Sequence, residues 1–220
     1  MKLTFQEIEK NPTIKTYIRK ADESLIALGY TEHSFNHVGR VAMMAKKILL
    51  DLGYSPREAE LAAIAGYMHD IGNVINRVDH AQSGAVMAFR ILDNLQCDPE
   101  DIATIITAIG NHDEGTAFPV NPVAAALIIA DKCDVRRSRV RDKSTVALDI
   151  HDRVNFAVSK SQVIVLPEAK LIKLYLEIDT EICSVLEYFE IFTERMLLCK
   201  KAAEKLQTRF SLIINDQQIL

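Results

Sequence analysis

Residues 66–73 read GYMHDIGN and place His69 beside Asp70 at the end of an otherwise apolar helical run. Neighbouring residues of a helix point about 100° apart, so both side chains can reach one point only where the helix ends, and Gly72 is expected to end it. An unpaired carboxylate in an apolar helix is costly unless a partner compensates its charge. A metal ion is the strongest such partner, and imidazole with carboxylate is a suitable ligand pair. We therefore interpret His69 and Asp70 as metal ligands.

Helix starts are marked in the first part of the chain by cap residues that precede proline. The side chain of the cap accepts a hydrogen bond from a free helix N–H group, and proline suits the first helical position. These pairs are Asn11-Pro12, Ser55-Pro56, Asp98-Pro99 and Asn121-Pro122. Between them, apolar residues recur at helical spacing. We predict a mainly α fold with six helices, near residues 12–28, 35–52, 56–70, 80–95, 99–110 and 122–137.

The hydrophobic period changes from about residue 153 onward. Alternating apolar residues predict strands at Val154–Val158, Ile172–Ile178 and Phe210–Ile214, with a β-branched run at 163–166 and a helix near 181–206. We therefore divide the chain into a helical metal-binding domain, residues 1–150, and a small α+β layer, residues 151–220. So short a layer has a marginal core of its own, so we expect it to pack on the helical domain or to form a homodimer through an edge strand.

Composition limits the class of protein and its partners. The chain has 220 residues, of which 49% are hydrophobic and 25% charged, and its net charge is −4. This balance gives no global reason to expect a nucleic acid or an anionic membrane as partner. The start, MKLTFQEIEKNPT, lacks the pattern of a signal peptide, and no uncharged stretch looks long enough to span a bilayer. We therefore expect a cytoplasmic protein without a membrane partner.

Further polar residues interrupt the predicted helices in the same way as the His-Asp pair. His37, His80 and His112 lie at or near predicted helix ends, and Asp131 interrupts the apolar helix PVAAALIIADK. Any one of them alone would be interpreted as a cap or a surface residue, as we do for His33 and His151. Shared coordination accounts for the set at once, and a bridging carboxylate can hold two ions close together.

The order of these residues resembles the two-metal branch of the HD-domain metal-dependent phosphohydrolases. The local contexts HVGRVA, AGYMHDIGN, GNHDE and ADKCDVRR carry the resemblance, which covers about residues 20–140. It implies an HD-type helical bundle with two divalent ions, iron or manganese first, then zinc, cobalt, nickel or magnesium. It also implies one ion held by His37, His69, Asp70 and Asp131, with Asp70 bridging to a second ion that is held also by His80 and His112.

One position departs from that pattern. Many two-metal members have a lysine shortly after the His-Asp pair, where this chain has Asn73. A lysine there could contact a phosphate or the leaving group. The departure therefore bears on the substrate and on how its leaving group is stabilised.

A basic stretch begins directly after Asp131. Residues 132–143 carry six basic and two acidic side chains. Because arginine matches the geometry of phosphate oxygens, we predict that Arg136 and Arg137 bind the phosphate of the substrate. The alternative is a solvated helix end, which we keep for Arg141 and Lys143. No aromatic residues are interleaved with the basic ones, which disfavours nucleic acid as a partner.

The leading functional hypothesis is hydrolysis of a phosphate ester or anhydride in a small, nucleotide-like substrate, by a phosphomonoesterase or phosphodiesterase. A hydroxide that bridges two metal ions through the Asp70 site would be the nucleophile. Lys132, Asp113 and His33 are candidate proton donors to the leaving group. The first alternative is a mixed-valence di-iron oxygenase of the same fold, which would use the same ligands. The second is a nucleotide-binding sensor or adaptor without catalysis.

Overall fold

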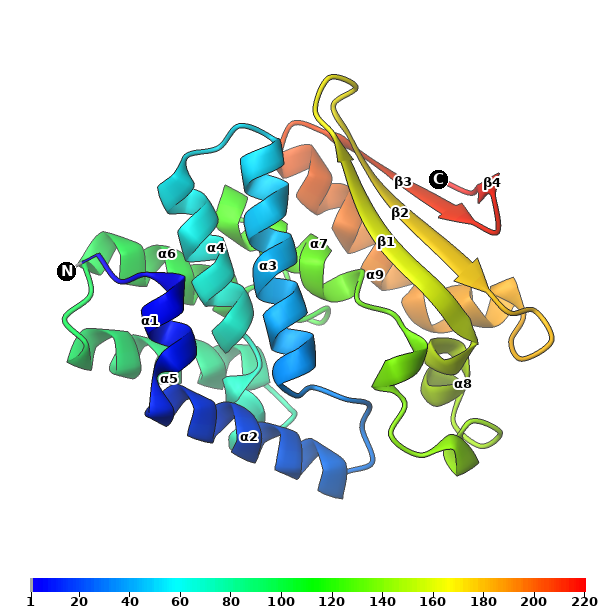
Figure 1. The fold of residues 1–220 in the computed structure, drawn as a ribbon, viewed down its shortest axis with the longest axis horizontal. Coiled ribbons are helices and arrows are strands. Elements are labelled where there is room, and N and C mark those ends of the chain that lie inside the picture. Colours follow the sequence, from blue (N-terminus) through cyan, green and yellow to red (C-terminus); the bar gives the residue numbers. More distant parts are fainter. Residues whose placement is uncertain (1) are drawn as a thin grey trace.

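The computed structural model describes residues 2–220, which form a helical bundle followed by a small sheet and a long helix (Figure 1). The bundle comprises α1 (Phe5–Lys10), α2 (Pro12–Ala27), α3 (Phe35–Asp51), α4 (Pro56–Met68), the 3-10 turn η1 (Ile71–Val74), α5 (His80–Asn94), α6 (Pro99–Gly110) and α7 (Pro122–Lys132). The remainder comprises the 3-10 turns η2 (Arg137–Arg139) and η3 (Lys143–Thr145), then α8 (Ile150–Ala157), β1 (Val158–Leu166), β2 (Leu171–Ile178), α9 (Val185–Lys205), β3 (Arg209–Ile214) and β4 (Gln217–Gln218). The fold is mainly α, as predicted.

The six predicted helices are all present, and five of them end within two residues of the predicted bounds. Local chemistry explains this agreement, because each cap residue before proline accepts a hydrogen bond from a first-turn N–H group. Helix α1 was not predicted. Thr4 and Glu7 form a capping box at its start, so the spacing Thr-x-x-Glu was the available signal.

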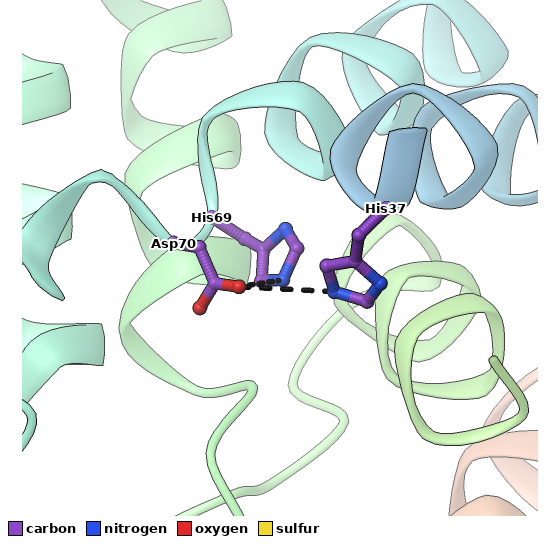
Figure 2. A group of neighbouring side chains, drawn as sticks. All are labelled: His37, His69 and Asp70. Carbon is purple, nitrogen blue, oxygen red and sulfur yellow. Dashed lines mark ion pairs between the residues drawn. The ribbon is translucent and has the colours of Figure 1, made fainter. Parts of the chain in front are cut away.

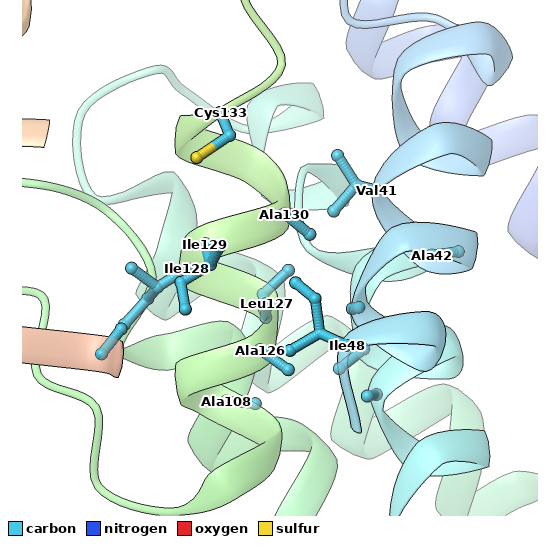
Figure 3. Packing of buried hydrophobic residues seen from close by; sticks show 14 of the residues in the cluster. Val41, Ala42, Ile48, Ala108, Ala126, Leu127, Ile128, Ile129, Ala130 and Cys133 are labelled. Carbon is cyan, nitrogen blue, oxygen red and sulfur yellow. The ribbon is translucent and has the colours of Figure 1, made fainter. Parts of the chain in front are cut away.

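Helix α7 lies at the centre of the bundle. Residues 123–130 are all buried, because α3, α4, α6 and α9 pack around this helix. Figure 3 shows Val41 and Ile48 of α3 beside Leu127 and Ala130 of α7. A helix that is apolar on every side is stable only inside a core. The position of its last turn, which carries Asp131, is therefore fixed by packing from several directions.

The C-terminal sheet has the order β1-β2-β3-β4. β1 and β2 pair antiparallel, β2 and β3 pair parallel, and β3 and β4 pair antiparallel. The parallel pair requires a crossover, which α9 provides, and α9 contacts both β3 and α7. Alternate residues of β2 are buried, as expected for a strand with one covered face. The strands predicted at Ile172–Ile178 and Phe210–Ile214 are confirmed.

Two sequence predictions about this region are wrong. The strand predicted at Val154–Val158 is mostly the helix α8, which Asp149 starts by accepting a hydrogen bond from the Asp152 N–H. Val154 and Ala157 are buried three residues apart, so the apolar alternation was part of a helical face. The helix predicted to reach residue 137 ends at Lys132. The basic stretch therefore continues as a loop with short 3-10 turns.

The hydrophobic core is continuous from α1 to β3 and includes residues of both parts of the chain. The C-terminal layer thus packs on the helical bundle, which is one of the two arrangements expected for it. Pairing of its edge with a second copy stays a prediction. Within residues 2–220, no helix combines the length and apolar character needed to cross a membrane.

A close approach of α3 and α4 allows a test of this packing. A Cβ atom at Gly66 would lie 2.8 Å from the Ala42 Cα and 2.9 Å from the Ala42 backbone nitrogen. Since backbone cannot move as a side-chain tip can, we expect Gly66→Ala to lower the free energy of unfolding by about 1–3 kcal/mol. Urea unfolding measures the change.

Gly39→Ala is the matched control for this variant. Gly39 also lies within a helix, but a Cβ atom there would meet nothing within 4 Å. The control should raise the free energy of unfolding by about 0.5–1 kcal/mol, because alanine favours helix more than glycine does. Equal stability of the two variants would contradict the close packing of α3 on α4.

Candidate metal centre

All six predicted ligands come from ends of helices, and these ends meet at one place. His37 lies in the first turn of α3, His69 and Asp70 follow α4, and His80 is the first residue of α5. His112 lies two residues beyond α6, and Asp131 is in the last turn of α7. Figure 2 shows His37 of α3 facing the His69-Asp70 pair. The structure therefore brings together residues that are far apart in sequence.

Gly72 contributes to this arrangement in a way the sequence did not reveal. It does not have the left-handed backbone of a helix C-cap; among the described glycines that conformation occurs at Gly29 and Gly53. Instead, a Cβ atom at Gly72 would lie 2.0 Å from the His80 carbonyl oxygen and 2.5 Å from the Gly84 nitrogen. Glycine is therefore required because η1 packs directly on the backbone of α5.

The four histidines are held in the same tautomer. His69, His80 and His112 each donate from Nδ1 to a backbone carbonyl, those of Gly66 (2.8 Å), Arg77 (3.0 Å) and Ile109 (2.6 Å). His37 donates from Nδ1 to the Asp134 carboxylate at 2.8 Å. When its ring is neutral, each imidazole therefore has the Nε2 lone pair for another partner, which at His80 is Arg77 Nη1 at 3.3 Å. A hydrogen-bonded Nδ1 with a free Nε2 is the usual state of a metal-ligating histidine.

The two carboxylates lie between these Nε2 atoms. Asp70 Oδ2 lies 3.2 Å from His69 Nε2 and 3.7 Å from His37 Nε2, while Asp70 Oδ1 lies 3.6 Å from His80 Nε2. Asp131 Oδ1 lies 3.3 Å from His37 Nε2 and 3.7 Å from His69 Nε2. The two oxygens of Asp70 thus face different histidines. The side chains form three overlapping groups, and within each group the ligand atoms lie within 4.8 Å of one another. The groups are His37, His69 and Asp70; His69, His112 and Asp131; and Asp70, His80 and His112.

Buried polar atoms without partners test whether a metal fits here. Within residues 2–220, four buried side-chain atoms make no hydrogen bond: His37 Nε2, His69 Nε2, Asp70 Oδ2 and Glu114 Oε1. Glu114 Oε1 is ion-paired with Arg195, and the other three atoms belong to one cluster, where leaving them unsatisfied is costly. A divalent cation bound between them would satisfy all three, and nitrogen with carboxylate oxygen is a donor set that divalent transition metals accept. The residues therefore fit a metal.

The charges of the cluster suit a cation as well. Burial raises the pKa of Asp70, but the neighbouring His69 outweighs it and holds the pKa well below its usual value. Burial likewise raises the pKa of Asp131, but Lys132, His37 and His69 together outweigh it and hold the pKa well below its usual value. His112 has a pKa well below its usual value, because burial and then the His69 and Lys132 charges oppose its protonation. Ionised carboxylates beside a neutral imidazole are the protonation states that metal binding requires.

Asp134 contacts the cluster through His37 and was not among the residues predicted from the sequence. Besides accepting from His37, it accepts from Arg40 Nε at 3.3 Å and from Arg136 Nε at 3.0 Å. Burial raises the pKa of Asp134, but the hydrogen bond from His37 and the charges of His37, Arg139 and Arg136 together lower it. A carboxylate behind a ligating imidazole orients the ring and raises its basicity. The signal in the sequence was an aspartate three residues after Asp131, the spacing of one helical turn.

A cavity of about 390 Å³ opens beside the cluster. On its wall lie His33 and four of the six ligands, Asp70, His80, His112 and Asp131. Four cations line it as well, Arg77, Lys132, Arg139 and Arg195. Residues of α8 and α9 complete the wall, among them Asp149, Asp152, Asn155 and Phe192. The C-terminal part of the chain thus contributes directly to this cavity.

The predicted proton donors differ in their position. Lys132 is buried on the cavity wall, with Nζ 2.7 Å from Asp131 Oδ2 and 3.2 Å from Glu114 Oε2. Asp113 Oδ1 lies 3.9 Å from His80 Nε2 but is not among the residues that line the cavity. His33 does line it, and its Nδ1 donates to the Thr31 carbonyl at 2.7 Å. The Nε2 atom of neutral His33 is therefore an acceptor, which argues against His33 as a donor.

The structure does not bring Arg136 and Arg137 into the cavity. Arg136 pairs with Glu32 at 2.9 Å and with Asp134 at 3.0 Å. Arg137 lies over the Phe156 ring at 4.8 Å and donates to the Phe156 carbonyl. Their positions argue against the predicted phosphate contact. That prediction assumed a helix through residue 137, whereas the chain leaves the helix at Lys132 and turns these side chains elsewhere.

The central position of Asp70 gives a test of the cluster. We expect Asp70→Ala, purified anaerobically and loaded with Mn²⁺, to lose all bound metal, because its oxygens face three of the four histidines. Elemental analysis measures the metal content. Asp93→Ala, at an exposed site of α5, is the control and should bind metal as the unmodified chain does. Full metal content in Asp70→Ala would rule out the assignment of Asp70 as the ligand at the centre of the cluster.

Asp134 allows a second test that leaves all six ligands in place. Asp134→Asn keeps the shape of the side chain but removes the charge behind His37, so metal affinity should fall about 10- to 100-fold. Asp101→Asn is the control, because Asp101 is also buried and paired with an arginine, Arg57, but lies outside the cluster. Competition with a metallochromic chelator measures both affinities. Equal affinities in the two variants would show that Asp134 does not support the metal.

The sequence of this chain is similar to that of known proteins. The model of the HD domain family matches residues 34–153. The uncharacterized protein MJ1020 of Methanocaldococcus jannaschii is 26% identical over 162 residues, which cover 64% of this chain and 62% of that protein, so this chain spans less than two thirds of its length. A crystal structure described as a predicted HD superfamily hydrolase, from an uncultured Thermotogales bacterium, is 26% identical with a TM-score of 0.44, covering 56% of this chain and 67% of that chain. Because the family model covers more than half of the sequence, the chain belongs to the HD domain family.

Proposed function

We propose that this protein is a metal-dependent phosphohydrolase that cleaves a phosphate ester or anhydride in a small, nucleotide-like substrate. The observation that carries the proposal is the cluster of unpartnered buried atoms on His37, His69 and Asp70, beside a cavity lined by four cations. Metal ligands and cations around one cavity suit a reaction in which a negatively charged phosphoryl group is attacked. The cavity volume of about 390 Å³ suits a small molecule.

Two metal ions would be held by the six residues. His37, His69, Asp70 and Asp131 would hold one ion, and Asp70, His80 and His112 would hold the other. Two of the three ligand groups support this division, namely His37 with His69 and Asp70, and Asp70 with His80 and His112. The two Asp70 oxygens also lie near different histidines. Bound divalent ions would supply Lewis-acid activation of the phosphoryl group and of the attacking water. Iron and manganese are the first candidates for a set of this kind.

Side chains of the cavity wall would act on the leaving group and on the substrate or water. Burial lowers the pKa of Lys132, but Asp131 and Glu114 outweigh it, so the net shift is upward and the ammonium stays charged. Lys132 can therefore stabilise negative charge in the cavity and is the best-placed donor of a proton to the leaving group. Neutral His33 can accept a hydrogen bond from substrate or water. The walls from α8 and α9 would restrict the entry of bulk water.

Anaerobic phosphate release tests the proposal. The full chain, loaded anaerobically with Mn²⁺ or Fe²⁺, should release phosphate from at least one member of a panel of p-nitrophenyl phosphate, nucleotides and dinucleotides. Activity should disappear with a chelator and in Asp70→Ala, because both remove the metal. Substrate consumption that requires dioxygen and yields no phosphate would instead support the oxygenase alternative. Nucleotide binding without turnover by the metal-loaded chain would support the sensor alternative.

A further inference from the structure

Two guanidinium groups on the wall of the cavity lack a carboxylate partner. Among the described residues, no Asp or Glu oxygen lies within 4.0 Å of the guanidinium of Arg77 or of Arg139. Other cations nearby are paired, since Arg195 contacts Glu114 at 2.5 Å and Lys132 contacts Asp131 at 2.7 Å. Two positive charges therefore line the cavity without a carboxylate in direct contact, although Asp70, Asp131, Asp149 and Asp152 line the same cavity.

Arg139 is the more buried of the two, with 5% of its surface exposed. Its Nε donates to the Glu32 carbonyl at 3.0 Å and its Nη1 to the Asp134 carbonyl at 2.9 Å. Both acceptors are neutral, and they fix the plane of the guanidinium while the described structure gives Nη2 no hydrogen-bond partner. Arginine stays charged even when burial lowers its pKa, as it does here. Asp134, Asp131 and Asp70 are close enough to raise the pKa of Arg139, but none of their carboxylates contacts its guanidinium. A buried cation without a direct anionic contact is costly, so an anionic ligand in the cavity would stabilise it.

Arg77 is held beside the metal centre by the residue that departs from the family pattern. Its Nη1 donates to Asn73 Oδ1 and to His80 Nε2, both at 3.3 Å, and its guanidinium lies 5.5 Å from the centre of the Tyr30 ring. Asn73 in turn donates from Nδ2 to Asp70 Oδ1 at 3.0 Å. Asn73 thus connects a ligand, Asp70, to a cation of the cavity wall.

We infer that Arg77 and Arg139 together form an anion clamp that binds the phosphate group of the substrate. This inference rests on the proposed function and replaces Arg136 and Arg137 in the role that the sequence suggested for them. Guanidinium groups match phosphate oxygens with paired, charge-assisted hydrogen bonds. His33 lies close to both arginines, whose charges contribute, after burial, to the low pKa of its imidazole. The clamp selects a ligand with a doubly charged terminal phosphate over a neutral analogue, which would leave both cations unpaired.

Binding of inorganic phosphate tests the clamp without reference to turnover. Titration calorimetry at neutral pH and low salt is carried out on the full chain, both metal-free and loaded with Mn²⁺. Arg77→Gln and Arg139→Lys should each weaken phosphate binding about 10-fold or more, as expected for the loss of a charge-assisted hydrogen bond. Arg90→Gln, at an exposed site of α5, is the matched control and should bind phosphate as the unmodified chain does. Metal content should be the same in Arg77→Gln as in the control.

Arg77→Gln keeps the test valid even if Arg139→Lys disturbs folding. Arg77 is only partly buried and makes no contact with a buried carboxylate, so its replacement should leave the melting temperature without phosphate unchanged. Phosphate should raise that temperature less in Arg77→Gln than in Arg90→Gln. Unchanged phosphate affinity in Arg77→Gln, or no phosphate binding by the unmodified chain, overturns the clamp. If the clamp fails while anaerobic hydrolysis persists, the proposed function still stands; if phosphate binds but no ester is hydrolysed, the proposed function fails instead.

Discussion

Two carboxylates, Asp70 and Asp131, are buried where five helices end, and the arrangement of the surrounding residues follows from their charge. Burying an ionised carboxylate is expensive, and each additional carboxylate nearby increases the cost. Four imidazoles, each with Nδ1 already bonded, present their remaining nitrogen to this pair or lie next to one that does. A divalent cation bound among them would provide partners for the unpartnered atoms of His37, His69 and Asp70.

Close packing of the helices holds the buried carboxylates and histidines of the cluster in place. Asp131 ends a helix whose neighbours cover it on every side, and His37 begins a helix that packs closely on α4. At Gly72, η1 packs directly on the backbone of α5, so the Asp70 and His80 segments cannot separate easily. The ligands are therefore positioned before any ion binds, which lowers the entropic cost of binding.

The C-terminal part is electrostatically connected to the metal centre. Glu114 lies between Arg195 of α9 and Lys132, at 2.5 and 3.2 Å. Burial raises the pKa of Glu114, but Lys132 and Arg195 outweigh it and lower the pKa to about 2. Lys132 also contacts Asp131, so a chain of charges leads from α9 to a metal ligand. A change in the position of α9 would thus alter both the cavity wall and the charge next to Asp131.

Six helices of the bundle, α9, the two later strands and the six residues of the cluster could be predicted from the sequence, because caps, hydrophobic period and residue type act over a few positions. Helices α1 and α8 were not predicted. Which polar residues support the cluster, and which cations face the cavity, depends on contacts between distant parts of the chain. Asp134 meets His37 across 97 positions of sequence, and Arg139 meets Glu32 across 107. Helix α7 ends at Lys132, and the loop after it places Arg136 beside Glu32 and Asp134 and Arg137 beside Phe156, away from the cavity. Helical periodicity cannot reveal such a change, because it carries no information on partners that are distant in sequence.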